Sequence, residues 1–260
     1  MMQKDIILIA DYGRSGQGWL SYMICYILNA RYIEPYCLLR GIVFSGHDKI
    51  VELTQGNLPA RAKTRYNLVV KTHNLPDYYF SLTDKVILLA RDPRDVAVSA
   101  LARYTVAFKT GTDVEVGAQK KMDGLKLGKS IFRRFIEWLK TVKLVCYFFT
   151  AYRWKKFYES WDGLSLSHRL TYEELSSNPK ATLQRLLKYL EIEASDELID
   201  EAIGEFTFKK LTGREKGSEQ KGNVAFRKGI VGDYCNHFSK VQLYLFKAIC
   251  GKIMSLWRYK

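Results

Sequence analysis

Short apolar runs alternate with helix-like segments over the first hundred residues. Residues 6–10 (IILIA) form a run that ends at Asp11, and residues 67–71 (NLVVK) and 85–90 (KVILLA) repeat the pattern. Unbroken apolar runs of this length are typical of strands buried on both faces. The first and third runs are each followed by a loop and an amphipathic or apolar helical segment. This alternation predicts an α/β fold with a central parallel sheet flanked by helices.

Helical patterns dominate the rest of the chain. The spacing of apolar residues predicts one strand, over 164–170, and helices over 131–158, 179–190, 197–205 and 242–254. Residues 105–128 contain several glycines and no clear period, which indicates a loop or lid. Because no internal repeat or proline-rich linker divides the sequence, we expect a single domain over residues 1–260.

Composition and charge narrow the class of protein. Of the 260 residues, 47% are hydrophobic and 26% are charged, as in ordinary folded proteins. These fractions exclude a disordered chain, a collagen and a coiled coil. The formal net charge of +14 favours anionic partners: phosphate or sulfate ligands, acidic polymers, nucleic acid or anionic lipid.

The cysteines and the terminal segments indicate the cellular compartment in which the protein is expected. The cysteines are odd in number, widely spread and without a CxxC pair: Cys25, Cys37, Cys146, Cys235 and Cys250. We therefore expect reduced thiols, no zinc site and a cytoplasmic protein. The amino-terminal segment does not resemble a signal peptide, and the apolar run 144–152 is about half a membrane span. The basic and apolar segment 247–260 leaves room for peripheral membrane contact, although a packed terminal helix is the favoured interpretation.

The first candidate site is the glycine-rich turn after the first predicted strand. Residues 13–19 (GRSGQGW) let the backbone curl so that several N–H groups face an anion, at the positive end of the next helix. Gly13 and Gly18 have P-loop spacing, but Trp19 and Leu20 stand where a nucleotide triphosphatase needs Lys and Ser or Thr. The turn therefore predicts phosphate binding without magnesium-dependent hydrolysis; a plain strand–helix turn is the alternative.

Two motifs follow the next predicted strands. Lys71 and His73 lie in KTHNLP, where a histidine can act as a general base near neutral pH. Arg91 and Ser99 lie in RDPRDVAVS, and a guanidinium with a hydroxyl can bind one anion. The residues alone leave open a structural or surface histidine, a solvated lysine and an Arg–Asp surface network.

A fourth motif completes a family resemblance. In residues 227–233 (RKGIVGD), two cations beside a glycine could close over a phosphate or form a solvated loop. Together the motifs resemble those of the sulfotransferases that use 3′-phosphoadenosine 5′-phosphosulfate (PAPS), especially the cytosolic type. GRSGQGW is similar to PKSGTTW, KTHNLP to KTHLP and RDPRDVAVS to RNPKDVAVS; TYEELSSNPK is similar to YEDM…NPK and RKGIVGDYCNHF to RKGxxGDWKNHF. The matches keep their order over residues 11–238.

The resemblance implies a P-loop-like three-layer fold and a role for each matching residue. His73 would be the catalytic base, with Arg14 and Lys71 as catalytic cations. The 5′-phosphosulfate would be held by Arg14, Ser15, Gly16, Gln17 and Gly18, the adenine by Trp19, Tyr172 and Phe208, and the 3′-phosphate by Arg91, Ser99, Arg227, Lys228 and Gly229. PAPS would be the donor and 3′,5′-adenosine diphosphate (PAP) the product, with no metal.

The sequence also departs from the family pattern. Arg14 stands where the family usually has lysine, which keeps the charge but makes proton donation difficult. Gln17 and Gly18 replace two threonines, and Tyr234 replaces tryptophan. The family's dimer motif KxxxTVxxxE is absent after residues 236–238, which puts dimerisation through that element in doubt.

We therefore expect transfer of a sulfuryl group to a hydroxyl or amine of a small-molecule, lipid or sugar acceptor, without a nucleic-acid partner. The alternatives are a P-loop small-molecule kinase and a non-enzymatic basic module that binds an acidic polysaccharide or nucleic acid. Residues 36–66, 103–128 and 209–226 would frame the acceptor. His47 and Asp48 could orient it, although a turn or surface pair is the favoured interpretation. Aromatic candidates for its pocket are Tyr36, Phe44, Tyr78, Tyr79, Phe80, Tyr104 and Phe108.

Overall fold

The chain divides into two units in the computed structural model. The structure describes residues 5–33, 62–76, 83–110, 129–162, 164, 167–218 and 226–260, with backbone alone for 104–110 and 129–142. Unit 1 comprises residues 1–91 and 156–213, and unit 2 comprises residues 92–155 and 214–260. The single domain expected from the sequence stays a prediction.

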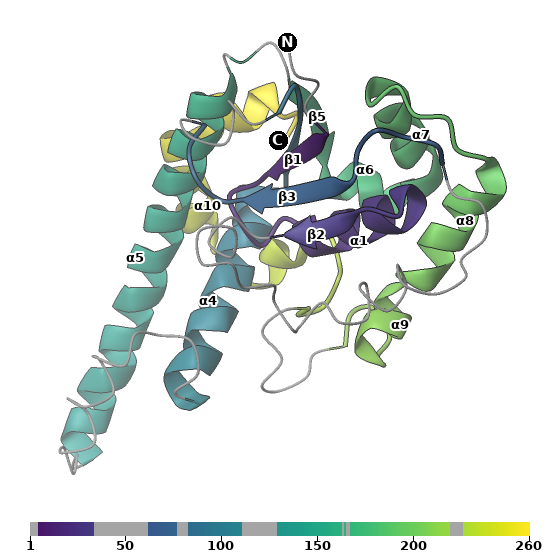
Figure 1. Ribbon diagram of the computed structural model, residues 1–260. Helices are drawn as coiled ribbons and strands as arrows, with labels where there is room; N and C mark the ends of the chain where they lie inside the picture. The colour runs from purple at the N-terminus through teal and green to yellow at the C-terminus, as the bar shows by residue number, and fades with distance from the viewer. Residues whose placement is uncertain are drawn as a thin grey trace. The chain divides into compact units, whose positions relative to one another are not determined.

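A five-stranded parallel sheet in the order β2-β3-β1-β4-β5 forms the centre of unit 1 (Figure 1). Its strands are β1 (Ile6–Ala10), β2 (Arg31–Ile33), β3 (Leu68–Thr72), β4 (Lys85–Ala90) and β5 (Ser167–Thr171). Since all pairings are parallel, the carboxyl ends of the strands lie along one edge, where ligands of such sheets bind. That edge carries the residues that follow each strand.

Short helices follow the strands of unit 1. They are α1 (Gln17–Leu28), α6 (Tyr172–Ser177), α7 (Pro179–Tyr189), α8 (Asp196–Glu205) and α9 (Phe208–Thr212). Side chains cap the amino-terminal ends of the last four helices, through Thr171, Asn178, Ser195 and Thr207. The capped starts explain why helices begin so soon after the preceding strand or helix.

Both faces of the sheet are covered. Ile7, Ile9 and Leu89 belong to a buried cluster with residues of α1, α7 and α8. The alternate residues of β1 and β4, such as Leu8 and Leu88, are equally buried on the opposite face. At the end of α5, the Tyr158 hydroxyl donates to the carbonyl of Leu89 at 2.6 Å. The predicted α/β fold, with a parallel sheet flanked by helices, is confirmed.

Unit 2 is helical in its described part. It contains α4 (Pro93–Thr110), α5 (Lys129–Asp162) as far as residue 155, the 3₁₀ turn η4 (Asp233–Asn236) and α10 (Lys240–Leu256). A capping box at Ser239 and Gln242 begins α10, which buries Phe246, Cys250 and Met254. None of the helices in the described residues is both long and apolar enough to cross a membrane. The burial of Phe246, Cys250 and Met254 shows that the C-terminal segment forms a packed helix, the interpretation that the sequence favoured.

Most predicted elements are confirmed in type, with bounds shifted by a few residues. The prediction of a loop was wrong for residues 105–110, which extend α4 because neither proline nor glycine occurs before Gly111. The remainder of that predicted lid, 111–128, lies outside the described residues. The short elements β2, α6, α9 and η4 were not predicted, since none is long enough to show a hydrophobic period.

Candidate active site

The turn between β1 and α1 presents backbone donors. Gly13, Arg14 and Gly16 adopt left-handed conformations, with φ angles of 101°, 61° and 86°. Gly16 is the N-cap of α1, and no side chain caps the first N–H groups of this helix. A left-handed turn at a helix amino terminus directs N–H groups at an anion. The predicted phosphate-binding turn therefore has the backbone of an anion site.

Two polar side chains hold this turn from within. Ser15 Oγ donates to the carbonyl of Gly13 at 3.3 Å, and Gln17 Nε2 donates to the carbonyl of Ile9 at 2.5 Å. Both residues are almost completely buried. Because the side-chain donors of Ser15 and Gln17 are used inside the protein, the turn offers a ligand mainly its backbone N–H groups.

Arg91 and Tyr172 lie side by side because the last residues of β4 and β5 are paired in register. The guanidinium of Arg91 lies 4.4 Å from the centre of the Tyr172 ring, and its Nη1 donates to the carbonyl of Arg14 at 3.3 Å. A Cβ atom on Gly16 would lie 2.5 Å from Cδ2 of Tyr172. The turn, Arg91 and Tyr172 therefore form one packed cluster, in which glycine is required at position 16.

Aromatic side chains flank this cluster. The Trp19 ring meets the Tyr172 ring edge-on, with centroids 6.2 Å apart. Phe208 begins α9 and is buried. Trp19 and Tyr172 thus lie in contact beside the turn.

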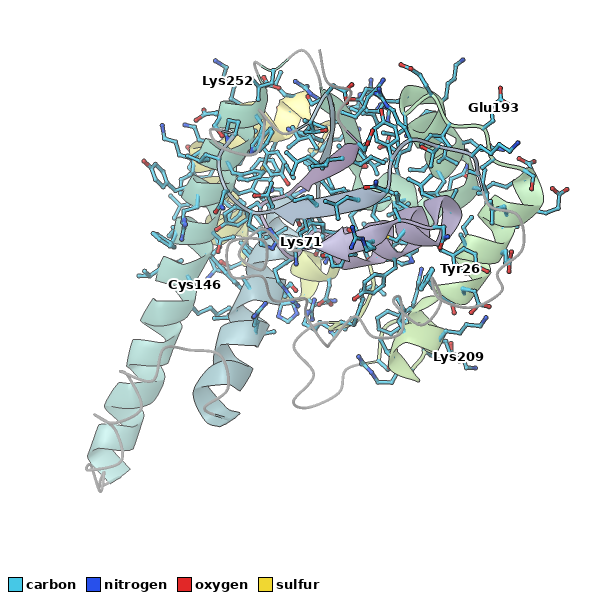
Figure 2. All side chains as sticks on the ribbon, in the orientation of Figure 1. Tyr26, Lys71, Cys146, Glu193, Lys209 and Lys252 are labelled. Carbon is cyan, nitrogen blue, oxygen red and sulfur yellow. The ribbon has the colours of Figure 1, made fainter. Side chains whose placement is uncertain are left out.

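His73 meets a buried carboxylate beside the same turn. Ala10 of β1 pairs with Thr72 of β3, so Asp11 and His73 follow paired residues. Nδ1 of His73 lies 2.7 Å from Oδ1 of Asp11, which is completely buried. Burial lowers the pKa of His73, but the Asp11 carboxylate raises it by more, so the net pKa is above the ordinary value. Lys71, on β3 (Figure 2), lowers the pKa of His73 by a smaller amount.

Residues 92–99 of the motif RDPRDVAVS lie in unit 2, where they hold the loop that contains RKGIVGD. Asp95 is completely buried and accepts hydrogen bonds from the N–H groups of Gly232, at 2.7 Å, and Tyr234, at 2.9 Å. The Arg94 guanidinium donates to the Asp92 carboxylate at 2.6 Å and lies 4.0 Å from the Tyr234 ring centre. Part of this motif therefore shapes the second loop rather than facing a ligand.

Asp233 draws the predicted cations together. Its buried carboxylate accepts from Arg227 Nη2 at 2.6 Å, Lys228 Nζ at 3.2 Å and Asn236 Nδ2 at 3.1 Å. Burial alone would raise the pKa of the Asp233 carboxyl, but these hydrogen bonds hold it well below its usual range. Arg227 and Lys228 are therefore held in place by a shared carboxylate.

Arg214 closes the same loop from the other side. Its guanidinium donates to the carbonyls of Phe226, at 2.6 Å, and Arg227, at 3.1 Å. Gly229 has a left-handed φ of 68°, which glycine adopts without strain. Ser99 is buried on α4. The loop around Arg227 is thus fixed by charged groups on both sides.

The predicted site residues fall into two groups. Unit 1 holds Arg14, Ser15, Gly16, Gln17, Gly18, Trp19, Lys71, His73, Arg91, Tyr172 and Phe208, and unit 2 holds Ser99, Arg227, Lys228 and Gly229. Their roles toward a ligand stay predictions. The sequence reasoning missed three buried aspartates, Asp11, Asp95 and Asp233. Each stands inside or beside a quoted motif, which is the signal that could have found them.

Of the segments predicted to frame the acceptor, the structure describes residues 62–66, 103–110 and 209–218. Residues 36–61 and 111–128, and the side chains of Tyr104 and Phe108, lie outside the described residues, as do Tyr78, Tyr79 and Phe80. In the part of the chain that is described, His, Cys, Asp and Glu side chains form no group of three that could hold a metal ion. The expectation of metal-free chemistry stays a prediction.

A parallel α/β sheet with a glycine-rich turn at its carboxyl edge defines a P-loop-like anion-binding class. Comparison with known proteins gives the family. The sulfotransferase domain model matches residues 3–258. Bovine sulfotransferase 1E1 is 26% identical over 256 residues, covering 91% of this chain and 79% of its own length.

Solved structures agree at the level of the fold. The structure of mouse sulfotransferase SULT7A1 complexed with PAP covers 98% of this chain and 84% of its own, with a TM-score of 0.61 and 21% identity. Retinol dehydratase in complex with androsterone and PAP covers 98% and 82%, with a TM-score of 0.57 and 17% identity. Both share the fold described here.

The chain belongs to the sulfotransferase family. The prediction of a PAPS-dependent sulfotransferase is thereby confirmed at the level of the family, and the kinase and the non-enzymatic binding module are set aside.

Proposed function

We propose that this protein transfers the sulfuryl group of PAPS to a hydroxyl or amine acceptor, with His73 as general base. The observation that carries the proposal is the meeting of three features at one sheet edge: the anion-binding turn, Arg91 stacked on Tyr172, and His73 paired with Asp11. The sulfotransferases and the PAP complexes among similar proteins support the choice of donor.

The residues of unit 1 fit the 5′ end of such a donor. The backbone N–H groups of Ser15, Gly16, Gln17 and Gly18 and the guanidinium of Arg14 would hold the phosphosulfate. Trp19 and Tyr172, whose rings are in edge contact, would hold the adenine, together with Phe208. The left-handed turn and the absence of a side-chain cap on α1 are what the fit rests on.

Charged side chains would bind the 3′-phosphate. By the family resemblance, the groups assigned to it are Arg91 in unit 1 and Arg227, Lys228, the Ser99 hydroxyl and the Gly229 N–H in unit 2. Because Asp233 fixes both cations of unit 2, little side-chain entropy would be lost on binding. A guanidinium also binds two phosphate oxygens at once.

In the proposed reaction, His73 accepts a proton and the cations stabilise negative charge. The donor supplies an activated sulfuryl group, whose transfer spreads negative charge onto the leaving phosphate oxygen. Nε2 of His73 takes the acceptor's proton, while Arg14 and Lys71 neutralise the charge that develops. Arg14 acts by charge alone, since its pKa is too high for proton donation. Cations suffice for this, so the proposed mechanism uses no metal ion.

The acceptor is proposed as a small molecule, with lipids and sugars included. The androsterone complex of retinol dehydratase, a protein of the same fold, supports a small apolar acceptor. Peripheral membrane contact by α10 and a cytoplasmic location stay predictions. Val241, Tyr244 and Leu256 are exposed on that helix and compatible with such contact.

Transfer of labelled sulfate from PAPS to a panel of phenols, steroids, lipids and sugars tests the proposal. We expect wild-type turnover with at least one acceptor class, and loss of about 10² to 10⁴ in rate for His73→Ala, with PAP affinity nearly unchanged. His168→Gln is the matched control. His168 lies in β5, stacks on Tyr189 of α7 and has no proposed role. Normal turnover in His73→Ala refutes the base assignment, and no turnover with any acceptor contradicts the function.

A further inference from the structure

The contact between His73 and Asp11 is set by the sheet itself. The pairing of Ala10 with Thr72 continues for one more step, because the Asp11 N–H donates to the carbonyl of Thr72 at 3.1 Å. Asp11 and His73 therefore follow neighbouring strands at equal height. Nδ1 of His73 lies 2.7 Å from Oδ1 and 2.9 Å from the backbone oxygen of Asp11. Both neighbours of Nδ1 are acceptors, which requires a proton on this nitrogen.

Asp11 depends on His73 for its neutralisation. The Asp11 side chain is 0% exposed, and His73 is its ion-pair partner among the described residues. Neither of its side-chain oxygens has a partner with full hydrogen-bond geometry in the described part of the chain, so the 2.7 Å approach of Nδ1 is an ion-pair contact. A buried carboxylate without a cation is strongly unfavourable. The strand that precedes Asp11, β1, is apolar at every position.

Nε2 of His73 is the ring nitrogen that can accept a proton from an acceptor. No described residue hydrogen-bonds to Nε2, and the His73 side chain is 47% exposed. With the proton on Nδ1 fixed by Asp11, Nε2 carries the lone pair in the neutral ring. This is the arrangement in which a histidine accepts a proton while a carboxylate stabilises the imidazolium that forms.

We propose that Asp11 is the positioning residue of the sulfuryl-transfer reaction, holding His73 in the Nδ1–H tautomer and pairing with its imidazolium. The inference rests on the proposed function. In the step, the acceptor O–H proton passes to Nε2 while the acceptor oxygen bonds to sulfur. The bond between sulfur and the bridging oxygen breaks, and its electron pair stays on the phosphate. The imidazolium then returns its proton to water.

Other charged groups near the pair set its pH range. Lys71 on β3 lowers the pKa of His73, and Asp11 raises it by more. The Tyr158 hydroxyl, from α5, stays neutral because burial and the Asp11 charge raise its pKa well above the usual value. The acid limb of the kcat/KM profile should therefore lie above the ordinary histidine value of about 6.5 in the wild type.

The test compares Asp11→Asn with Asp5→Asn, in which the exposed aspartate just before β1 loses the same charge. We expect Asp11→Asn to lower kcat by about 10² to 10⁴, to move the acid limb to lower pH and to leave PAP affinity within about threefold. Asp5→Asn should change none of these. An unchanged pH profile and rate in Asp11→Asn would overturn the proposal.

A second measurement needs neither the variant nor turnover. In ¹⁵N-histidine NMR of the wild type at high pH, His73 should show the Nδ1–H tautomer, and its pKa should exceed that of His168. The Nε2–H tautomer for His73 would overturn the positioning role even if the enzyme is active. The Nδ1–H tautomer in a protein without any sulfuryl transfer would instead leave the pair intact and contradict the proposed function.

Discussion

The two units differ in charge and in the kind of group that carries their predicted anion-binding residues. Unit 1 has 18 lysines and arginines against 18 aspartates and glutamates, so it is neutral. Unit 2 has 23 against nine and therefore carries the whole net charge of +14. In unit 1, the predicted anion-binding groups are backbone N–H groups of a left-handed turn. In unit 2, the predicted groups are the cations Arg227 and Lys228, held by the buried carboxylate of Asp233, while Asp95 accepts hydrogen bonds from backbone N–H groups of the same loop.

This difference means that backbone conformation and side-chain charge can be tested separately, the first in unit 1 and the second in unit 2. A backbone site depends on the conformation of a few residues and loses its function when that conformation is changed. A side-chain site depends on the groups that hold its cations, because two like charges side by side repel unless a carboxylate lies between them. Unit 1 should therefore be sensitive to glycine substitutions, and unit 2 to the loss of a carboxylate.

The largest effect on stability is expected for Asp233→Asn. The change leaves Arg227, which is 8% exposed, close to Lys228 without a counter-charge. Removing one partner of a buried ion pair destabilises by about 3 kcal/mol. Urea unfolding measures the loss, with Glu193→Gln as an exposed control that should stay within about 0.5 kcal/mol. Equal stability of the two variants contradicts the role given to Asp233.

The same carboxylate gives a pH dependence. The pKa of Asp233 is held below its usual range by Arg227, Asn236 and Lys228. Its contribution to stability is therefore present above the unfolded-state pKa of about 3.9 and is lost as pH falls toward the lower folded-state pKa. The free energies of unfolding of the wild type and Asp233→Asn should differ fully near pH 6 and converge in acid. A constant difference between them in acid would contradict this assignment.

A pair of glycine substitutions tests the backbone site of unit 1. In Gly16→Ala, the new Cβ lies 2.5 Å from the Tyr172 ring at a φ of 86°, so we expect a loss of about 1 to 3 kcal/mol and weaker PAP binding. Gly18→Ala is the matched control, since Gly18 lies inside α1 with no atom nearer than 3.9 Å. It should gain about 0.5 to 1 kcal/mol. Thermal unfolding measures the stability of both variants. A Gly16→Ala protein as stable as the wild type would contradict the close packing of Gly16 against Tyr172.

The smallest effect is expected for Lys228→Ala. Arg227 remains on Asp233 at 2.6 Å, and the Lys228 side chain is 20% exposed. Partly solvated pairs contribute about 0 to 1 kcal/mol. PAP affinity should fall with little change in stability. A loss of stability as large as that of Asp233→Asn would show that the carboxylate is not the centre of this cluster.

The sequence predicted the strands better than the chemistry around them. Runs such as KVILLA are apolar at every position, so β4 was placed correctly, whereas β2 has three residues and no run. Motif residues such as His73, Arg91 and Tyr172 were found because their types suit anion chemistry. The aspartates that hold them were missed, since the burial of Asp11 or Asp233 depends on partners far away or on loop geometry.

The central claim, a donor site for a 3′-phosphorylated nucleotide, is tested most directly by thermal unfolding with PAP, 5′-AMP or ATP–magnesium. A ligand at about 100 times its Kd stabilises a fold by about 2.7 kcal/mol. We predict a clear rise in Tm with PAP and a much smaller one with 5′-AMP, which lacks the phosphate that Arg91, Arg227 and Lys228 would bind. An equal rise with 5′-AMP, a rise with ATP–magnesium alone, or no rise with any nucleotide would contradict the account.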